Sequence, residues 1–384
     1  MIYDKIVRNK NIVNKKNYIH VKNYFVNGGF IEVISSFKKN FTVEFWNKKN
    51  ECEFKTVLES NSWARTNKKY FEEYTCKVYD GDVLLYDEKY DAKGKRVYIA
   101  LDSKSLGDTL AWFPYVDEFR KKWNCEMICS TFWNHLFEKQ YPNIKFVNPG
   151  EAVNNLYAMY NIGWYYSKDI VDYSKNPQDF KNQSLQQTAT DILGLDFEHV
   201  KAKLNLPTIE KTKKVGIGLH STAQAKYWNN PTGWQDVTDY LIKNGYEVTI
   251  LSKEENGYMG NQHPIGAKKL PTGSIDDLIK EMLSCDFFIG IGSGLSWLAW
   301  TLNLPIILIS GFSTPISEFN GDNVYRIFNE SVCNGCFNRY RLDAGDWNWC
   351  PDKKGTEKQF ECTKSISFED VKFYLEKIIQ NNKD

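Results

Sequence analysis

The stretch Cys285 to Gly311, CDFFIGIGSGLSWLAWTLNLPIILISG, decides the fold of this chain. Its apolar run Phe287 to Ile291 is short and bulky enough for a strand that is buried on both faces. The glycine turn, Gly292-Ser293-Gly294, ends that run. An amphipathic helix is expected over residues 295–302, and a second buried strand over residues 305–310. The stretch therefore predicts a strand–turn–helix–strand unit of a parallel sheet.

The glycine turn itself has two readings. It would leave backbone N–H groups open at a helix N-terminus, where anions bind well. An ordinary βαβ unit, in which the glycines only make room for the turn, explains the pattern equally well, because Gly-Ser-Gly alone is a weak signal.

Strands and helices alternate in two segments of the chain. The first begins with the buried strand Arg96 to Leu101, and a helix that contains Pro114 follows from Thr109 to Trp123. The second begins after a polar, proline-interrupted linker, Leu204 to Lys214. This alternation predicts two Rossmann-like domains, and ligands of such sheets bind at the carboxyl ends of the strands.

The N-terminal residues follow another pattern. Alternating runs such as Phe41 to Phe45, with turns such as Asp80-Gly81 between them, are typical of hairpins and predict a small barrel or sandwich. We therefore divide the chain into a β-rich domain, a first and a second Rossmann-like domain, and place their bounds at 1–95, 96–210 and 211–384. The last domain includes a loop at 333–362 and a C-terminal helix.

Composition excludes some classes of function. The 49 basic and 48 acidic residues give a net charge of +1. This balance lacks the excess of positive charge that is typical of proteins that bind nucleic acid or an anionic membrane. The N-terminus has no apolar core of a signal peptide, and no apolar run is long enough to span a bilayer. We therefore expect a cytoplasmic protein without membrane insertion.

Two residues at predicted strand ends could carry chemistry. Asp108 lies in a loop before a helix, where a carboxylate can act as general base towards a hydroxyl. A helix N-cap is the commoner role for an aspartate in that position. Lys226 lies in the polar loop after the strand that begins at Val215, and it could neutralise a phosphate with help from Ser221 and Thr222. The alternative for Lys226 is a solvated surface lysine.

Four of the nine cysteines form the most specific local pattern. They are spaced C-x2-C-x13-C-x11-C, at Cys333, Cys336, Cys350 and Cys362. Such spacing is typical of closed structural metal sites, and four thiolates suit zinc or a single iron. The alternative is a loop of reduced, unliganded thiols.

These motifs together resemble a known family. GSGLSWLA, Gly292 to Ala299, resembles the nucleotide-binding signature of bacterial heptosyltransferases of the glycosyltransferase-9 type. SLGDTL, Ser105 to Leu110, resembles their first-domain loop with its catalytic aspartate, and KYWN, Lys226 to Asn229, resembles their donor-phosphate loop. The N-terminal extension and the four-cysteine loop resemble the autotransporter heptosyltransferases in particular.

The resemblance implies a fold, an activity and a site. It implies a GT-B fold and an inverting O-heptosyltransferase that uses ADP-heptose and modifies serines of an autotransporter passenger domain. It implies Asp108 as the catalytic base, and one structural iron on the four cysteines with zinc as the alternative. It further implies a homo-oligomer, up to a dodecamer. The expected donor-binding residues are Thr222, Lys226, Gly292, Ser293, Gly294, Leu295 and Ser296.

The sequence leaves two alternative functions open. A lipopolysaccharide heptosyltransferase, or another sugar-nucleotide transferase, would share the donor motifs. A nucleotide-binding scaffold without catalytic activity would use the β-rich region to hold a partner. No motif in residues 1–95 identifies an acceptor.

Overall fold

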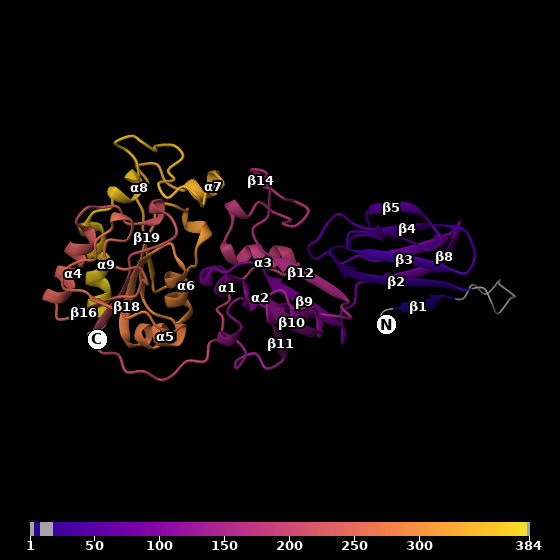
Figure 1. Cartoon of the computed structure of the whole chain (residues 1–384), viewed down its shortest axis with the longest axis horizontal. Helices are drawn as coiled ribbons and strands as arrows, with labels where there is room; N and C mark the ends of the chain where they lie inside the picture. The colour runs from indigo at the N-terminus through magenta and orange to yellow at the C-terminus, as the bar shows by residue number, and fades with distance from the viewer. Residues whose placement is uncertain (1–3, 8–17, 382–384) are drawn as a thin grey trace. The chain divides into compact units, whose positions relative to one another are not determined.

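The computed structural model describes residues 4–7 and 18–381, and the chain forms two compact units (Figure 1). Unit 1 comprises residues 1–104, 112–180 and 186–200, and unit 2 comprises residues 105–111, 181–185 and 201–384. Each unit has its own sheets, and both combine α-helices with parallel strands, which confirms the α/β class.

Unit 1 contains an eight-stranded sheet. Its parallel part has the order β11-β10-β9-β12, and β12 continues by parallel pairing to β2, which pairs antiparallel with β1 and β3. The strands are β1 (Asp4–Val7), β2 (Ile19–Val26), β3 (Phe30–Ser35), β6 (Ser62–Arg65), β9 (Arg96–Leu101), β10 (Glu126–Ser130), β11 (Ile144–Val147) and β12 (Ala158–Ile162). The predicted strand at 96–101 is confirmed, whereas the aromatic segment around β12 was not recognised as a strand.

A second sheet of unit 1 has the open order β5-β4-β7-β8. It consists of β4 (Asn40–Trp46), β5 (Cys52–Glu59), β7 (Thr75–Asp80) and β8 (Val83–Lys89), and this confirms the predicted hairpins. Gly81, with φ 57°, takes the left-handed conformation that the turn between β7 and β8 requires. A closed barrel is not confirmed, because the other N-terminal strands continue the α/β sheet through the pair β2–β12.

The helix predicted over residues 109–123 is two helices, α1 (Leu106–Trp112) and α2 (Pro114–Trp123). Pro114 is the first residue of α2, because proline has no N–H to donate inside a helix but suits its first turn. Between residues 131 and 200 the chain also forms α3 (Leu185–Leu193), β13 (Tyr166–Ser167), β14 (Ile170–Val171) and short 3-10 turns at Asn134–Leu136 and Phe180–Asn182.

Unit 2 is built on a six-stranded parallel sheet of order β17-β16-β15-β18-β19-β20. The strands are β15 (Lys214–Gly218), β16 (Glu247–Ile250), β17 (Lys268–Lys269), β18 (Cys285–Ile291), β19 (Ile306–Ile309) and β20 (Val324–Ile327). The helices are α4 (Gly233–Lys243), α5 (Ile275–Ser284), α6 (Gly294–Thr301), α7 (Cys336–Arg339), α8 (Glu361–Lys364) and α9 (Phe368–Asn381). Short 3-10 turns lie at Gln224–Lys226, Tyr258–Gly260 and Pro315–Ser317.

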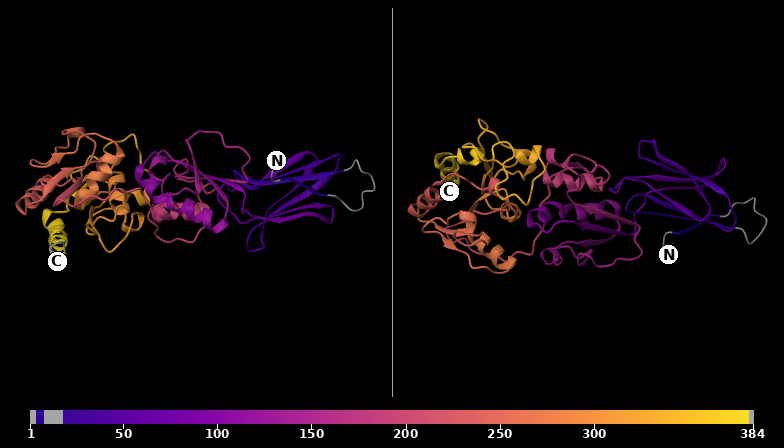
Figure 2. Two further views of the ribbon diagram at one scale, coloured as in Figure 1. Left: turned by 90° about the horizontal axis from the view of Figure 1, so that it is seen from below. Right: turned by 45° about the horizontal axis from the view of Figure 1, so that its top comes forward.

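The two faces of this sheet differ in side-chain size, and helices cover both (Figure 2). One face carries branched and aromatic side chains such as Ile217 and Ile289, which form one core with α4 and α9. The other face carries Phe288 among glycines, and a methyl group added at Gly290 would clash with the Phe288 ring and lie 2.9 Å from the hydroxyl of Ser296 in α6. The glycines therefore let α6 lie close to β18 and bring the start of α6 to the strand end.

The longest of these helices, α9, has 14 residues, whereas a bilayer requires about 20 apolar ones. Over residues 4–7 and 18–381, no helix combines the length and the apolar character that crossing a membrane requires.

Candidate active site

The start of α1 lies against the glycine turn, within unit 2. A methyl group added at Gly294 would lie 3.2 Å from the backbone nitrogen of Gly107. Conversely, one added at Gly107 would lie 3.1 Å from the Trp297 ring and 3.3 Å from the Cα of Gly294. Two facing glycines therefore bring the segment that carries Asp108 next to the N-terminus of α6.

Asp108 is the third residue of α1, so its predicted place in a loop is wrong. The helix begins earlier, at Leu106, because Ser105 takes the capping position. The Asp108 N–H donates to the Ser105 hydroxyl over 3.4 Å, and the Thr109 N–H donates to the Ser105 carbonyl. The capping role predicted as the alternative for Asp108 thus belongs to Ser105, and the Asp108 carboxylate lies in the first turn, partly buried.

Lys226 ends the 3-10 turn Gln224–Lys226 and is partly buried, not a solvated surface lysine. Its ammonium donates to the Thr222 hydroxyl over 3.3 Å and lies 5.0 Å from the centre of the Phe312 ring. Burial lowers the pKa of Lys226, and the carboxylates of Glu318 and Asp108 partly offset that shift. The three charged groups are therefore close enough to affect one another.

The N-terminus of α6 has open hydrogen-bonding capacity. Ser293, its N-cap, has an extended backbone and makes no capping hydrogen bond, and its buried hydroxyl has no partner. Ser296 differs, because its hydroxyl donates to the Ile291 carbonyl over 2.6 Å and its N–H donates to the Ser293 carbonyl. The first residues of the turn are thus better placed to meet a ligand than Ser296 is.

Glu318 is a site residue that the sequence reasoning missed. It is only 9% exposed, and its Oε1 accepts from the Ser313 hydroxyl over 3.0 Å. A methyl group added at Gly292 would lie 3.1 Å from the same oxygen. A single glutamate after a short loop gives no local signal, and only the folded sheet brings it to the glycine turn.

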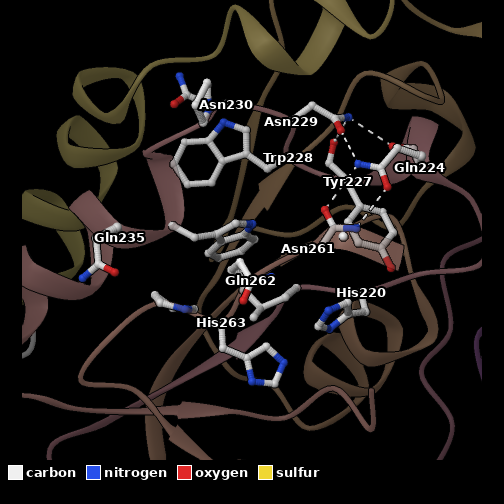
Figure 3. Close-up of a pocket in the computed structure, with 15 residues that line it drawn as sticks. His220, Gln224, Tyr227, Trp228, Asn229, Asn230, Gln235, Asn261, Gln262 and His263 are labelled. Carbon is white, nitrogen blue, oxygen red and sulfur yellow. Dashed lines mark hydrogen bonds between the residues drawn. The ribbon is translucent and has the colours of Figure 1, made fainter. Parts of the chain in front are cut away.

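An uncharged cavity of about 380 Å³ lies on another side of the loop at 219–232 (Figure 3). Gln224, Asn229 and Asn261 are linked there by hydrogen bonds. The buried Nδ1 of His220 makes no hydrogen bond and lies 3.9 Å from Glu254 Oε2. No Lys, Arg, Asp or Glu lines this cavity. A diphosphate would have to find its counter-charge elsewhere, and Lys226 at the glycine turn offers one.

The cysteine loop, residues 333–362, packs beneath the lysine. Cys336, Cys350 and Phe312 share a small apolar cluster with Ala225, the neighbour of Lys226. The N–H groups of Gly335 and Phe337 donate to the carbonyls of Gly311 and Phe312, over 2.8 and 3.0 Å. The loop therefore supports the ring on which the Lys226 ammonium lies.

The four thiols of this loop lie near one another. Burial, together with the charges of Cys336, Cys333 and Cys350, raises the pKa of Cys362 to about 12. Among the described residues, however, no three His, Cys, Asp or Glu side chains lie as close together as metal coordination requires. The donor set of four thiols fits zinc or iron chemically, and small movements of the loop would have to complete a site.

Comparisons with known proteins identify the family of this chain. The model of glycosyltransferase family 9 (heptosyltransferase) matches residues 168–337. Autotransporter heptosyltransferase BAHTCr of Citrobacter rodentium is 38% identical over 80% of this chain and 77% of its own. Autotransporter heptosyltransferase Aah of Escherichia coli is 37% identical, over 80% and 81%.

A solved structure extends the likeness to the fold. The iron-containing dodecameric glycosyltransferase TibC from enterotoxigenic E. coli H10407 matches with a TM-score of 0.86 at 32% identity, over 94% of this chain and 96% of that chain. TibC has also been solved in complex with ADP-D-beta-D-heptose. Sequence and fold together show that this chain belongs to the autotransporter heptosyltransferases and is a glycosyltransferase.

Proposed function

We propose that the protein transfers heptose from ADP-heptose to serine residues of an autotransporter adhesin, with inversion at the anomeric carbon. The names of its relatives and the donor bound to TibC support the substrates. The observation that carries the chemistry is the grouping in unit 2 of a carboxylate, an ammonium and a helix start: Asp108, Lys226 and Ser293.

Asp108 is the proposed general base. Its carboxylate accepts the proton of the serine hydroxyl while the serine oxygen forms a bond to the anomeric carbon. The bond between that carbon and the diphosphate oxygen breaks on the opposite face, and ADP departs. One displacement of this kind inverts the anomeric configuration.

Lys226, Thr222 and the turn at residues 292–295 are the proposed diphosphate site. Negative charge develops on the departing ADP, and an ammonium together with N–H groups at a helix N-terminus stabilises such charge. The unpartnered Ser293 hydroxyl supplies one further donor. Ser296 is kept only as part of the helix start, since both of its donors are already used.

The intact mass of a co-expressed autotransporter passenger fragment tests the proposal. Wild-type protein should add one or more heptose masses to the fragment, and fragmentation should place them on serine. Asp108→Asn should lower kcat by about 10²- to 10⁴-fold, the usual contribution of a general base, and leave ADP-heptose binding nearly unchanged. Asp276→Asn, at an exposed position in the first turn of α5, is the matched control and should behave as wild type.

The same assay separates the rival functions. Transfer to a lipopolysaccharide core acceptor but not to the passenger fragment would favour a lipopolysaccharide heptosyltransferase. Normal turnover by Asp108→Asn would refute the base assignment. No transfer and no hydrolysis of ADP-heptose by wild-type protein would favour the nucleotide-binding scaffold.

The four cysteines are proposed to hold one structural iron per chain, with zinc as the alternative. Cys333, Cys336, Cys350 and Cys362 would be the ligands, and the iron-containing relative TibC supports this assignment. When bound, the ion would cross-link the loop and leave the transfer chemistry to the protein's own groups. Elemental analysis of the purified protein should find about one ion per chain.

The remaining proposals concern organisation. We propose a GT-B arrangement with domains at 1–95, 96–210 and 211–384, a homo-oligomer of up to twelve chains as in TibC, and a cytoplasmic location. Light scattering of the purified full-length protein would measure the oligomer.

A further inference from the structure

The carboxylate of Glu318 is the least explained group at the candidate active site. It is 91% buried, and only one of its oxygens, Oε1, has a partner, the Ser313 hydroxyl. Within the described chain, no hydrogen bond or ion pair engages Oε2. Oε2 is not among the fully buried atoms that lack a partner, so it remains accessible and can accept hydrogen bonds from a ligand.

Gly292 makes room for this carboxylate. Its φ lies outside the left-handed region, so its backbone conformation does not require glycine. What a side chain at 292 would meet is Glu318 Oε1, 3.1 Å from the added carbon. The glycine therefore provides the space in which the Glu318 carboxylate lies beside the diphosphate turn.

Glu318 lies near two cations, Lys226 and Arg326, without pairing with either. Burial lowers the pKa of both cations, and the charge of Glu318 opposes both shifts. Arg326 donates to the Ser310 hydroxyl over 3.1 Å, and its buried Nη2 has no partner. In the part of the chain that the structure describes, neither cation lies within 4 Å of a Glu318 oxygen. A carboxylate whose role was only structural would be expected to close one of these ion pairs.

A carboxylate beside a diphosphate site repels phosphate but attracts hydroxyl groups. The donor carries both kinds of group, and its sugar is attached directly to the phosphate that Lys226 would hold. We propose that Glu318 recognises the sugar of the donor by accepting hydrogen bonds from its hydroxyl groups. Glu318 is then a specificity-determining residue, and this inference rests on the proposed ADP-sugar function.

Two probes, ADP and ADP-heptose, separate sugar recognition from diphosphate binding. Calorimetric titration of full-length Glu318→Gln should show a 10- to 100-fold loss of affinity for ADP-heptose, the usual worth of a hydrogen bond to a charged group. Affinity for ADP should stay within about twofold or rise, because the removed charge repels phosphate. KM for ADP-heptose should rise more than kcat falls.

Three further variants make the test sharper. Glu318→Asp keeps the charge and should recover part of the lost affinity. Gly292→Ala should lower the affinity for ADP-heptose more than the affinity for ADP, because its methyl group crowds Oε1. Some loss of ADP affinity is expected as well, since residue 292 begins the proposed diphosphate turn. Glu330→Gln, an exposed carboxylate of the same unit, should change neither affinity.

The outcomes are distinguishable. Equal losses for ADP and ADP-heptose in Glu318→Gln would overturn the inference and assign Glu318 to the Lys226 phosphate site. Unchanged affinity for both probes would also overturn it. Wild-type protein that binds ADP-heptose no better than it binds ADP would refute sugar recognition at this site as a whole, and wild type that binds neither would refute the proposed function.

Discussion

Two regions of unit 2 contact the lysine loop, and they are built by different means. The stretch from β18 to β19 is almost entirely regular structure, with its strands paired on both sides and buried on both faces. The helical structure of the cysteine loop at 333–362 is limited to the four-residue helix α7 and the first two residues of α8. The first region is held by a sheet and a core, whereas the second depends on its thiols and a few aromatic rings.

The two regions contribute to the candidate site in different ways: the first supplies hydrogen-bond donors, and the second supports the lysine. The glycine turn presents N–H groups and the Ser293 hydroxyl directly to the candidate diphosphate site. The cysteine loop contributes through Phe312, whose ring lies below the Lys226 ammonium, and through the Trp347 carbonyl, which accepts from the Gln224 N–H over 3.1 Å. Damage to the loop should therefore act through the position of Lys226.

The largest expected effect comes from removing one thiol of the loop. Cys336→Ser should lower the free energy of unfolding by more than about 3 kcal/mol and remove the metal, because loss of a structural ion is among the largest single-residue effects. Hydrogen exchange should show lost protection in residues 333–362 while β18 and β19 stay protected.

Cys52→Ser is the control for this variant. Cys52 is exposed and lies in β5 of the other unit, so metal content and stability should not change. Equal loss of protection in β18 and in the loop would contradict the proposed independence of the two regions.

The sequence predicted the strands and the helix of the stretch from β18 to β19, but it did not predict the geometry of the cysteine loop. Apolar runs with glycine between them specify β18, α6 and β19 through local preferences and burial, and all three elements lie where they were predicted. The expected amphipathic character of α6 is wrong, because its residues 296–301 are all buried. The cysteine spacing indicated a metal site but no geometry, because irregular backbone has no periodic pattern. Glu318 was missed for a similar reason, since its role depends on a contact with Gly292 across 26 positions of the chain.

Two other misses have physical causes. Asp108 was expected in a loop, but Ser105 caps the helix three residues earlier and draws Asp108 into α1. β12 was not expected because its segment was noted only for closely spaced aromatic residues, whereas Tyr160 packs into the core beside Phe71 and Phe119. In both cases a contact outside the local pattern determined the outcome.

A smaller loss of activity is expected from filling the space between the facing glycines Gly107 and Gly294. Gly294→Ala would place a methyl group 3.2 Å from the Gly107 nitrogen, and overpacking of this kind costs about 1–3 kcal/mol. Turnover should fall with little loss of metal, since the change lies in the sheet-supported region. Gly345→Ala, in the exposed part of the cysteine loop, is the control and should leave turnover unchanged. Loss of metal from Gly294→Ala would show that the two regions are coupled more tightly than we infer.

The smallest expected effect is a change in how the affinity for the donor depends on pH. The pKa of Lys226 is lowered by burial, and its protonated form is the one that binds a diphosphate. Donor affinity should therefore be complete below that pKa and should fall as pH rises through it, starting below the pH of about 10.4 where an ordinary lysine titrates. Glu318 and Asp108 face this ammonium and oppose the shift, so Glu318→Gln should move the fall to lower pH.

Affinity for ADP measured between pH 7 and 10 would test this directly. Lys226→Met should bind ADP weakly at all pH values and lack the fall. A wild-type profile that is flat over this range would contradict the lowered pKa of Lys226, and ADP affinity of Lys226→Met equal to that of wild type would exclude Lys226 as the phosphate-binding cation.

The pairing of β2 with β12 has a consequence for how the chain is made. Phe25 and Val26 find their partners, Ala158 and Met159, only after roughly 130 further residues have been synthesised, which takes on the order of 10 s at ribosomal speed. During that interval the end of β2 at Phe25 and Val26 lacks its partner, because β1 covers only Ile19 to Lys22, and an unpaired strand edge is the kind of surface on which nascent chains associate wrongly. Synthesis of this protein should therefore benefit from a chaperone that binds extended segments, and slow translation before residue 158 should lower the yield of folded enzyme.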